Sequence, residues 1–344
     1  MRTQALKTGR ILATVVTLVL LAAGPASCGS SQSEALGDNS PQAVLNAALE
    51  TAKNVESISG NFEVAVTVEL DQTQVPQEAV EFLGQPIKIS GNFAAAGPAQ
   101  KAEYVINLSM AGKTMPVAAR LAENKAWLQL GNQWYEAPPE LLQQAGQFPY
   151  DKQKREEISR LLDDLGFDPA SWFKELQVAG EEKFGEAATY HLIGTPDPAK
   201  MVADMVGLME SQELMKLINP GGTVTEGLGA GMIPSAEELK ELESQATQIL
   251  RTLKAEFWIT KKSQELRKLV VDATLAPPVG KETDGLKSIS MAVVLNLDKY
   301  NQAVTVEAPT AALPFAELER VMNENPEQVL GPFMELMGSM GQNF

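Results

Sequence analysis

The strongest constraint on the fold is a recurring two-residue alternation of side-chain character. Residues 62–70 alternate between apolar side chains and a set that is mainly polar. Successive side chains of a strand point to opposite faces of a sheet, so this period predicts a strand with one apolar face. The same period recurs in six further segments: residues 87–93, 104–110, 115–121, 255–259, 269–275 and 289–297.

Short turn sequences link the strands of the first half into an antiparallel meander of about six strands. Residues 111–113, 123–125 and 131–133 each contain glycine or asparagine between two alternating segments. These residue types adopt the positive φ angles that tight hairpin turns require. A sheet of this size with one apolar face must curl to cover that face, which predicts a curved antiparallel sheet.

Helical periodicity marks the segments between the strands. Residues 41–53 carry apolar side chains at helical spacing, and Ser40 and Pro41 supply an N-cap and a first-position proline. Residues 155–166 also show an apolar helical face, and Asp197 caps a further helical stretch. The expected class is therefore α+β.

The order of the elements predicts one large domain with two additions. The domain covers residues 41–312, and a helical insert interrupts it at 197–251. Residues 313–344 are rich in methionine and apolar residues at helical spacing, which predicts an amphipathic C-terminal helix.

The first 27 residues have the pattern of a secretory signal peptide. Residues 11–23 are almost wholly apolar, and residues 24–27 are small or proline. The apolar run is shorter than the roughly 20 residues that a membrane-spanning helix needs. The basic start carries three cations and no acidic residue: Arg2, Lys7 and Arg10.

The only cysteine of the chain, Cys28, follows this signal directly. The arrangement resembles the lipobox of bacterial lipoproteins, which implies that Cys28 becomes the first residue and carries a thioether-linked diacylglycerol. Pro25 stands where a lipobox usually has leucine. Two acyl chains would anchor the protein stably on the extracytoplasmic face of the cell membrane, and residues 28–40 would form a flexible tether. The alternative is ordinary secretion with a free thiol.

Composition limits the classes of partner. Of the 28 Lys and Arg residues, three lie in the signal, which leaves 25 against 44 Asp and Glu and a net charge of −19. Such a chain is a poor ligand for nucleic acid. Anionic headgroups would also repel it, so a lipid tether rather than a basic patch would hold it at a membrane. With a single cysteine, the core must hold the fold without an internal disulfide, and we expect a monomer.

The sequence offers little catalytic chemistry. His191 is the only histidine, and no serine lies in a nucleophile-elbow motif. One histidine and one cysteine cannot form a His/Cys metal site, so we expect neither a metal nor another cofactor. The acidic pair Glu181-Glu182 is expected to be solvated charge, because neighbours on a strand point to opposite faces. Trp134 and the other tryptophans could stack on a sugar, although packing at a sheet edge is the alternative.

The order of elements resembles the mycobacterial LppX/LprG-type lipoproteins and, more distantly, the LolA/LolB lipoprotein carriers. The resemblance covers roughly residues 41–308, and both the helical insert and the tail after Pro309 are longer than the family pattern suggests. The segments that carry it, besides Cys28, are residues 54–59 (NVESIS), 128–135 (LQLGNQWY), 194–197 (GTPD), 255–260 (AEFWIT) and 266–268 (LRK).

The resemblance implies a half-barrel sheet closed on its concave side by helices, with an apolar cavity for acyl chains. Lipid chains need such an enclosure because each exposed methylene costs about 0.8 kcal/mol in water. The protein would bind a lipid or lipid-linked molecule and transfer or present it without covalent chemistry. The expected wall of the cavity is formed by inward strand positions: Val64, Val66, Ile106, Leu108, Val117, Leu121, Phe257, Ile259, Val271, Val293 and Leu295.

Two other functions fit the same pattern. The apolar face could be a filled core, and the protein a non-catalytic interaction or sensory module of the cell envelope. A hydrolase would have to use His191. In every case, we expect an aspartate at Val117 or at Leu295 to disrupt the fold as a buried unpaired charge.

Overall fold

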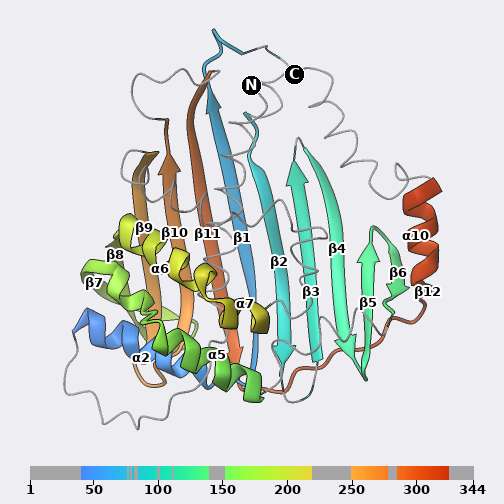
Figure 1. Cartoon of the computed structure of the whole chain (residues 1–344), viewed down its shortest axis with the longest axis horizontal. Helices are drawn as coiled ribbons and strands as arrows, with labels where there is room; N and C mark the ends of the chain where they lie inside the picture. The colour runs from blue at the N-terminus through green and yellow to red at the C-terminus, as the bar shows by residue number, and fades with distance from the viewer. Residues whose placement is uncertain are drawn as a thin grey trace.

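The structure, a computed structural model, describes residues 40–75, 77, 80, 84–97, 99, 101–110, 112–138, 152–218, 249–277 and 285–324. Within these residues one twelve-stranded sheet has the spatial order β12-β6-β5-β4-β3-β2-β1-β11-β10-β9-β8-β7 (Figure 1). Neighbouring strands are antiparallel, except that β12 and β6 run parallel. The sheet is open, with β7 and β12 at its two edges. The strands are β1 (Ser57–Leu70), β2 (Ile87–Ala96), β3 (Lys101–Met110), β4 (Lys113–Ala122), β5 (Lys125–Leu130), β6 (Gln133–Glu136), β7 (Phe173–Phe184), β8 (Ala187–Pro196), β9 (Leu250–Thr260), β10 (Leu266–Leu275), β11 (Leu286–Tyr300) and β12 (Leu313–Pro314).

The first six strands follow one another in space as in sequence, which confirms the predicted meander. Between β4 and β5, Glu123 and Asn124 have φ angles of 53° and 60°. Gly131 and Gly185 have φ angles of 59° and 62° in the turns after β5 and β7. Positive φ angles are those that tight hairpin turns require, so the turn residues explain where the strands end.

The two halves of the chain meet in the pair β1–β11. Val64 lies opposite Val293, and Phe62 lies opposite Leu295, although each pair is far apart in the sequence. The strands before and after the helical segments therefore form one continuous sheet rather than two.

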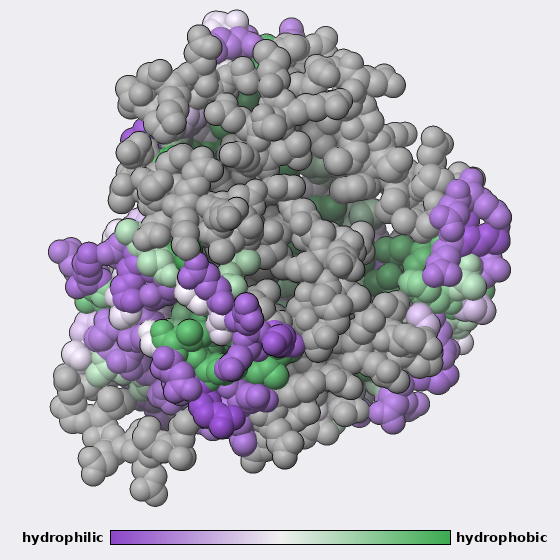
Figure 2. Space-filling view, in the orientation of Figure 1, coloured by the Kyte–Doolittle hydropathy of each residue, from purple (hydrophilic) through white to green (hydrophobic). Residues whose placement is uncertain are grey.

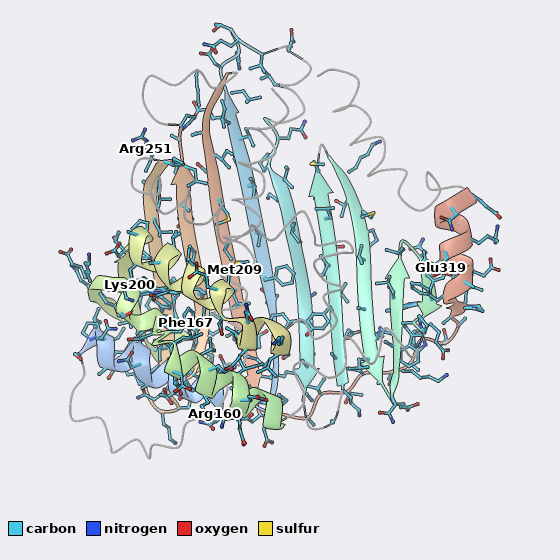
Figure 3. All side chains as sticks on the ribbon, in the orientation of Figure 1. Arg160, Phe167, Lys200, Met209, Arg251 and Glu319 are labelled. Carbon is cyan, nitrogen blue, oxygen red and sulfur yellow. The ribbon has the colours of Figure 1, made fainter. Side chains whose placement is uncertain are left out.

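The helices lie on one face of this sheet. Figure 3 shows the helical layer, from Lys200 on α6 to Arg160 on α5, over the half that contains β7–β11, whereas α10 with Glu319 lies at the opposite edge. This arrangement confirms the expected α+β class, a curved open sheet with helices on its concave side. The helical elements are α2 (Pro41–Lys53), α5 (Lys152–Asp164), the 3-10 turn η1 (Pro169–Trp172), α6 (Pro198–Glu210), α7 (Gln212–Ile218) and α10 (Phe315–Glu324).

Helix α2 confirms its predicted bounds of 41–53. Its N-cap is Ser40, whose Oγ accepts a hydrogen bond from the Ala43 N–H at 3.3 Å. Val44, Leu45 and Ala48 are buried on its inner face. The apolar spacing in the sequence thus marks the side of the helix that packs on the sheet.

The two predicted additions are described in part. Asp197 caps α6, since its carboxylate accepts the N–H groups of Ala199 and Lys200. Of the insert expected at 197–251, the structure describes α6, α7 and the beginning of β9, and residues 219–248 lie outside the described residues. The expected tail at 313–344 is described as far as Glu324, in β12 and α10.

An extended segment, residues 301–312, runs along the lower ends of the strands from β11 to β12 (Figure 1). Asn301 fixes its start: its backbone N–H donates to the Ser57 carbonyl at 2.8 Å, and its Oδ1 accepts the Glu56 N–H at 2.7 Å. Further along, Val306 is buried against Ala122 and Trp127 in a small second core. This segment ties the far edge of the sheet to its centre.

Candidate functional site

The structure places the eleven expected wall residues in two different environments. Four are only half-buried: Ile106, Leu108, Val117 and Leu121. The other seven are buried, with at most 8% of their surface exposed: Val64, Val66, Phe257, Ile259, Val271, Val293 and Leu295.

The seven buried residues belong to a core that the protein fills with its own side chains. Val44 and Leu45 of α2 lie in the same cluster as Val271 and Phe257. The ring of Phe257 meets that of Phe173 edge to face, with centroids 5.3 Å apart. Burying a large aliphatic or aromatic side chain contributes about 1.5–3 kcal/mol, so this half of the sheet is a stability core.

The four half-buried residues share one continuous apolar surface on β3 and β4. Ile106 lies opposite Val117, and Leu108 lies opposite Met115. Val117 in turn lies opposite Leu130 on β5. We call this surface, the concave side of β2–β5, the open apolar face. Its side chains are hydrophobic and partly accessible.

The helices described do not lie over the open apolar face in the way they cover the other half (Figure 1). Their outward surface is mainly hydrophilic, with hydrophobic side chains between α5 and α7 (Figure 2). Leu214 of α7 and Val206 of α6 are buried within this layer. The helical layer and the open apolar face therefore lie side by side on the concave side of one sheet.

Two phenylalanine–glycine pairs mark the border between the covered and the open halves. Phe62 on β1 lies opposite Gly91 on β2, and Gly60 lies opposite Phe93. A Cβ placed on Gly91 would be 3.1 Å from the ring of Phe62, and a Cβ on Gly60 would be 3.1 Å from the ring of Phe93. Each ring therefore covers the bare backbone of the neighbouring strand. Both rings are partly buried and pack against the main core.

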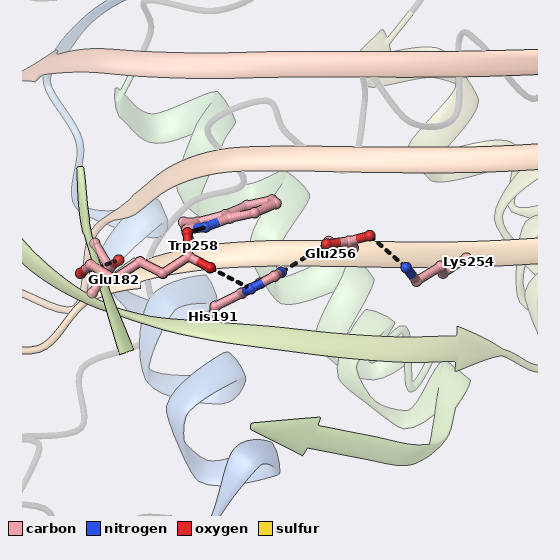
Figure 4. Close-up of polar contacts among 6 residues, drawn as sticks. Glu182, His191, Lys254, Glu256 and Trp258 are labelled. Carbon is pink, nitrogen blue, oxygen red and sulfur yellow. Dashed lines mark hydrogen bonds and ion pairs between the residues drawn. The ribbon is translucent and has the colours of Figure 1, made fainter. Parts of the chain in front are cut away.

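His191 lies on the opposite, convex face of the sheet, in a polar cluster on β7, β8 and β9 (Figure 4). Its Nδ1 is 2.9 Å from an oxygen of Glu182, and its Nε2 is 2.7 Å from an oxygen of Glu256. Its ring also stacks on Trp258 with centroids 4.2 Å apart. A doubly protonated ring donates to both carboxylates, whereas a neutral ring can donate to only one.

The two carboxylates of this cluster are stabilised in their charged forms. The Trp258 N–H donates to Glu182 at 2.8 Å, and this bond, more than the nearby His191, lowers the pKa of Glu182. The pKa of Glu256 is lowered first by the hydrogen bond from Lys254 and then by His191. The pattern of residues 181–182 predicts solvated charge, whereas Glu182 also contacts His191 on β8 and Trp258 on β9, and a local pattern does not encode such cross-strand contacts.

The geometry of His191 argues against the hydrolase hypothesis. In a catalytic triad one ring nitrogen faces the nucleophile and the other faces the orienting acid. Here both ring nitrogens face carboxylates. The cluster links the three strands β7, β8 and β9 through these side-chain contacts.

A shallow polar groove of about 370 Å³ lies on the convex face beside residues 301–312. Arg120 lines it, with its Nε 2.6 Å from Glu103 and its guanidinium 4.7 Å from the ring of Trp134. Trp134 thus packs against the Arg120 guanidinium near the sheet edge. Of the two interpretations of the tryptophans, sugar stacking and packing at a sheet edge, this contact agrees with packing. The groove is open and charged, in contrast to the open apolar face.

Within the described residues, three or more His, Cys, Asp and Glu side chains do not come together as a metal site. In the same part of the chain, each helix is too short or too polar to cross a bilayer. Cys28, the signal at 1–27 and all of the tether except Ser40 lie outside the described residues.

Comparisons with known proteins give structural similarity alone. No protein-family model matches the sequence, and no curated protein matches it. The lipoprotein LppX of Mycobacterium tuberculosis is 15% identical, over 79% of this chain and 100% of that one, with a TM-score of 0.34. LprF of Mycobacterium bovis is 14% identical, over 80% and 99%, with a TM-score of 0.36. A DUF1329 family protein of Desulfovibrio piger is 8% identical, over 78% and 96%, with a TM-score of 0.21.

The resemblance to LppX-type lipoproteins expected from the sequence is thus found again in the structure.

Proposed function

We propose that this protein is a lipid-anchored, extracytoplasmic binding protein that holds a lipid or lipid-linked molecule on its open apolar face and transfers or presents it. The observation that carries the proposal is the contrast between the two halves of one concave surface. The half with Val271 and Phe257 is filled by the protein's own helices, whereas the half with Ile106 and Val117 is apolar but only half-buried.

The chemistry of the open apolar face suits acyl chains. Cross-strand neighbours on it are hydrophobic: Leu108 and Met115, Ile106 and Val117. Covering such a surface with a hydrocarbon chain is favourable by about 25 cal/mol for each Å² removed from water. The proposed site is therefore narrower than the wall expected from the sequence, because seven of the expected residues already have protein partners.

The anchor belongs to the same proposal. An acylated Cys28, followed by a tether of about a dozen residues, would keep the domain near a bilayer from which it could take its ligand. The chain is acidic, with 44 Asp and Glu against 28 Lys and Arg, so a covalent lipid would be needed to hold it at an anionic surface.

A filled-core interaction module is the second candidate. It is favoured by the tight packing over β8–β11, where Val293 is 1% exposed and Leu192 is fully buried. The two functions differ in what the open apolar face contacts: acyl chains in one case and protein in the other.

The test is uptake of dipalmitoylphosphatidylcholine by the purified protein, measured by native mass spectrometry. We expect one-to-one binding in the wild type and its loss in Ile106→Asp, which puts a charge on the open apolar face. Val105→Asp is the matched control, because Val105 is the next residue on β3, half-buried on the opposite face. Absence of uptake by the wild type, or equal loss in both variants, would contradict the proposal.

A further inference from the structure

Phe62 and Phe93 lie at the border between the filled core and the open apolar face. Phe62 and Phe93 occupy diagonal positions on β1 and β2, each directly opposite a glycine of the other strand. The ring of Phe62 lies over Gly91, and the ring of Phe93 lies over Gly60. On one side of them is the filled core, with Leu295 opposite Phe62. On the other side is the open apolar face, with Tyr104 opposite Phe93. The two rings therefore stand where the accessible apolar surface ends.

We propose that Phe62 and Phe93 form the inner stop of the lipid site and set the longest acyl chain that the site accepts. This inference rests on the proposed function and assigns specificity within the same site. An acyl chain lying on the open apolar face would end against the two rings, because both rings pack against the core, whose side chains, such as Leu295, are buried.

The glycines make these two positions different from other apolar positions of the face. A ring that lies over a glycine has no side chain beneath it, only backbone. Truncating Phe62 would therefore uncover the backbone of Gly91, and truncating Phe93 would uncover that of Gly60. Each change would open a slot directed toward the core, as long as the strands keep their positions.

Tyr104 provides the matched comparison. It is an aromatic residue of the same face, 38% exposed, and it lies opposite Phe93 on one side and Ala119 on the other rather than opposite a glycine. Its removal would reduce the contact area for every ligand without opening a slot toward the core.

The experiment measures competition among dimyristoyl-, dipalmitoyl- and distearoylphosphatidylcholine for the full-length protein by native mass spectrometry. We expect Phe62→Ala and Phe93→Ala to shift the preference toward the longest probe by roughly tenfold, as when about two more methylenes are buried at about 0.8 kcal/mol each. Tyr104→Ala should weaken all three probes to a similar degree and leave their ranking unchanged.

The outcomes separate this inference from the function on which it rests. If the wild type binds none of the probes, the proposed function itself fails. If the wild type binds them and both alanine variants keep its chain-length ranking, the inner stop is wrong and the function stands. Should an alanine variant fail to fold, Phe62→Leu and Phe93→Leu retain an apolar side chain and should give a smaller shift in the same direction. An unchanged ranking in the leucine variants would then overturn the inference.

Discussion

The ring of Phe62 lies over Gly91 on the neighbouring strand, so that a Cβ at Gly91 would be 3.1 Å from Cε1 of the ring. The same Cβ would collide with the backbone carbonyl oxygen of Val105 on the third strand. A side chain at position 91 would therefore be too close to both neighbouring strands, and glycine avoids this because it has no Cβ. A glycine inside a strand commonly marks a bend or a close approach of another backbone, and here it marks the border between the two halves of the concave face.

Gly91→Ala should destabilise the protein by about 1–3 kcal/mol, the usual cost of forcing an extra carbon into a packed site. The backbone carbonyl of Val105 cannot rotate away as a flexible side chain could. The loss should appear as a lower midpoint in urea with an unchanged slope.

Gly207→Ala is the control for this substitution. Gly207 lies within α6, and a Cβ placed on it meets nothing within 4 Å. Alanine is favoured over glycine in a helix by up to about 1 kcal/mol, so this variant should be as stable as the wild type or slightly more stable. Equal destabilisation of both variants would show that lack of space around Gly91 is not the reason why alanine is unfavourable at position 91.

The sequence alone predicts that aspartate disrupts the fold at both Val117 and Leu295. The structure changes this prediction: we expect aspartate to unfold the protein at Leu295 but not at Val117. Leu295 is 4% exposed in the filled core, so Leu295→Asp buries an unpaired charge and should cost at least 3–5 kcal/mol. Val117 is half-buried on the open apolar face, so Val117→Asp should remain folded. Thermal melts of the two variants test the difference, and similar melting temperatures would contradict the division of the concave face into two environments.

The contrast between Leu295 and Val117 separates what the sequence predicts, the local elements, from what it does not, the packing between them. The bounds of α2 could be predicted because Ser40, Pro41 and the apolar spacing that follows are local signals. The strands and their turns could be predicted from equally local signals, and the inward positions follow from the period of two. The pairing of Val64 with Val293, however, depends on a contact between the first and last long strands, which the local period does not encode.

The candidate site was predictable only in part for the same reason. Phe257 and Ile106 occupy equivalent places in their alternating segments, yet one is packed beneath helices and the other is half-buried. The sequence of each strand predicts which of its faces is apolar. Tertiary packing decides which part of the apolar face the helices cover. The contacts of His191 likewise join three strands, so the pattern of any one of them could not reveal the cluster.

Trp258→Phe should weaken the dependence of stability on acidic pH. The hydrogen bond from Trp258 lowers the pKa of Glu182 below its ordinary value of 4.5. A lowered folded pKa contributes stability that is present above the unfolded pKa and is lost as the pH falls through the folded value. Phenylalanine keeps an aromatic ring beside His191 but removes the N–H donor, so the loss of stability below about pH 4.5 should become shallower.

The pH series has a direct readout and a control. Carbon NMR of the Glu182 carboxyl should show that it titrates at higher pH in Trp258→Phe than in the wild type. Glu182→Gln removes the titrating group altogether, so adding Trp258→Phe to it should change the pH slope no further. A further flattening in the double variant would mean that the slope comes from another carboxyl, such as Glu256.

Cys28→Ser should release the protein from the membrane. A thioether-linked diacylglycerol supplies two acyl chains, which anchor a protein stably where one chain would not, and serine cannot accept that modification. The acidic domain offers an anionic bilayer no attraction of its own, so the variant should move to the soluble fraction after export, as measured by fractionation of cells that express it. Ser27→Ala keeps a small residue before the cysteine and should remain with the membrane. If Cys28→Ser also stays there, the anchor lies elsewhere in the chain and residues 28–40 are not its tether.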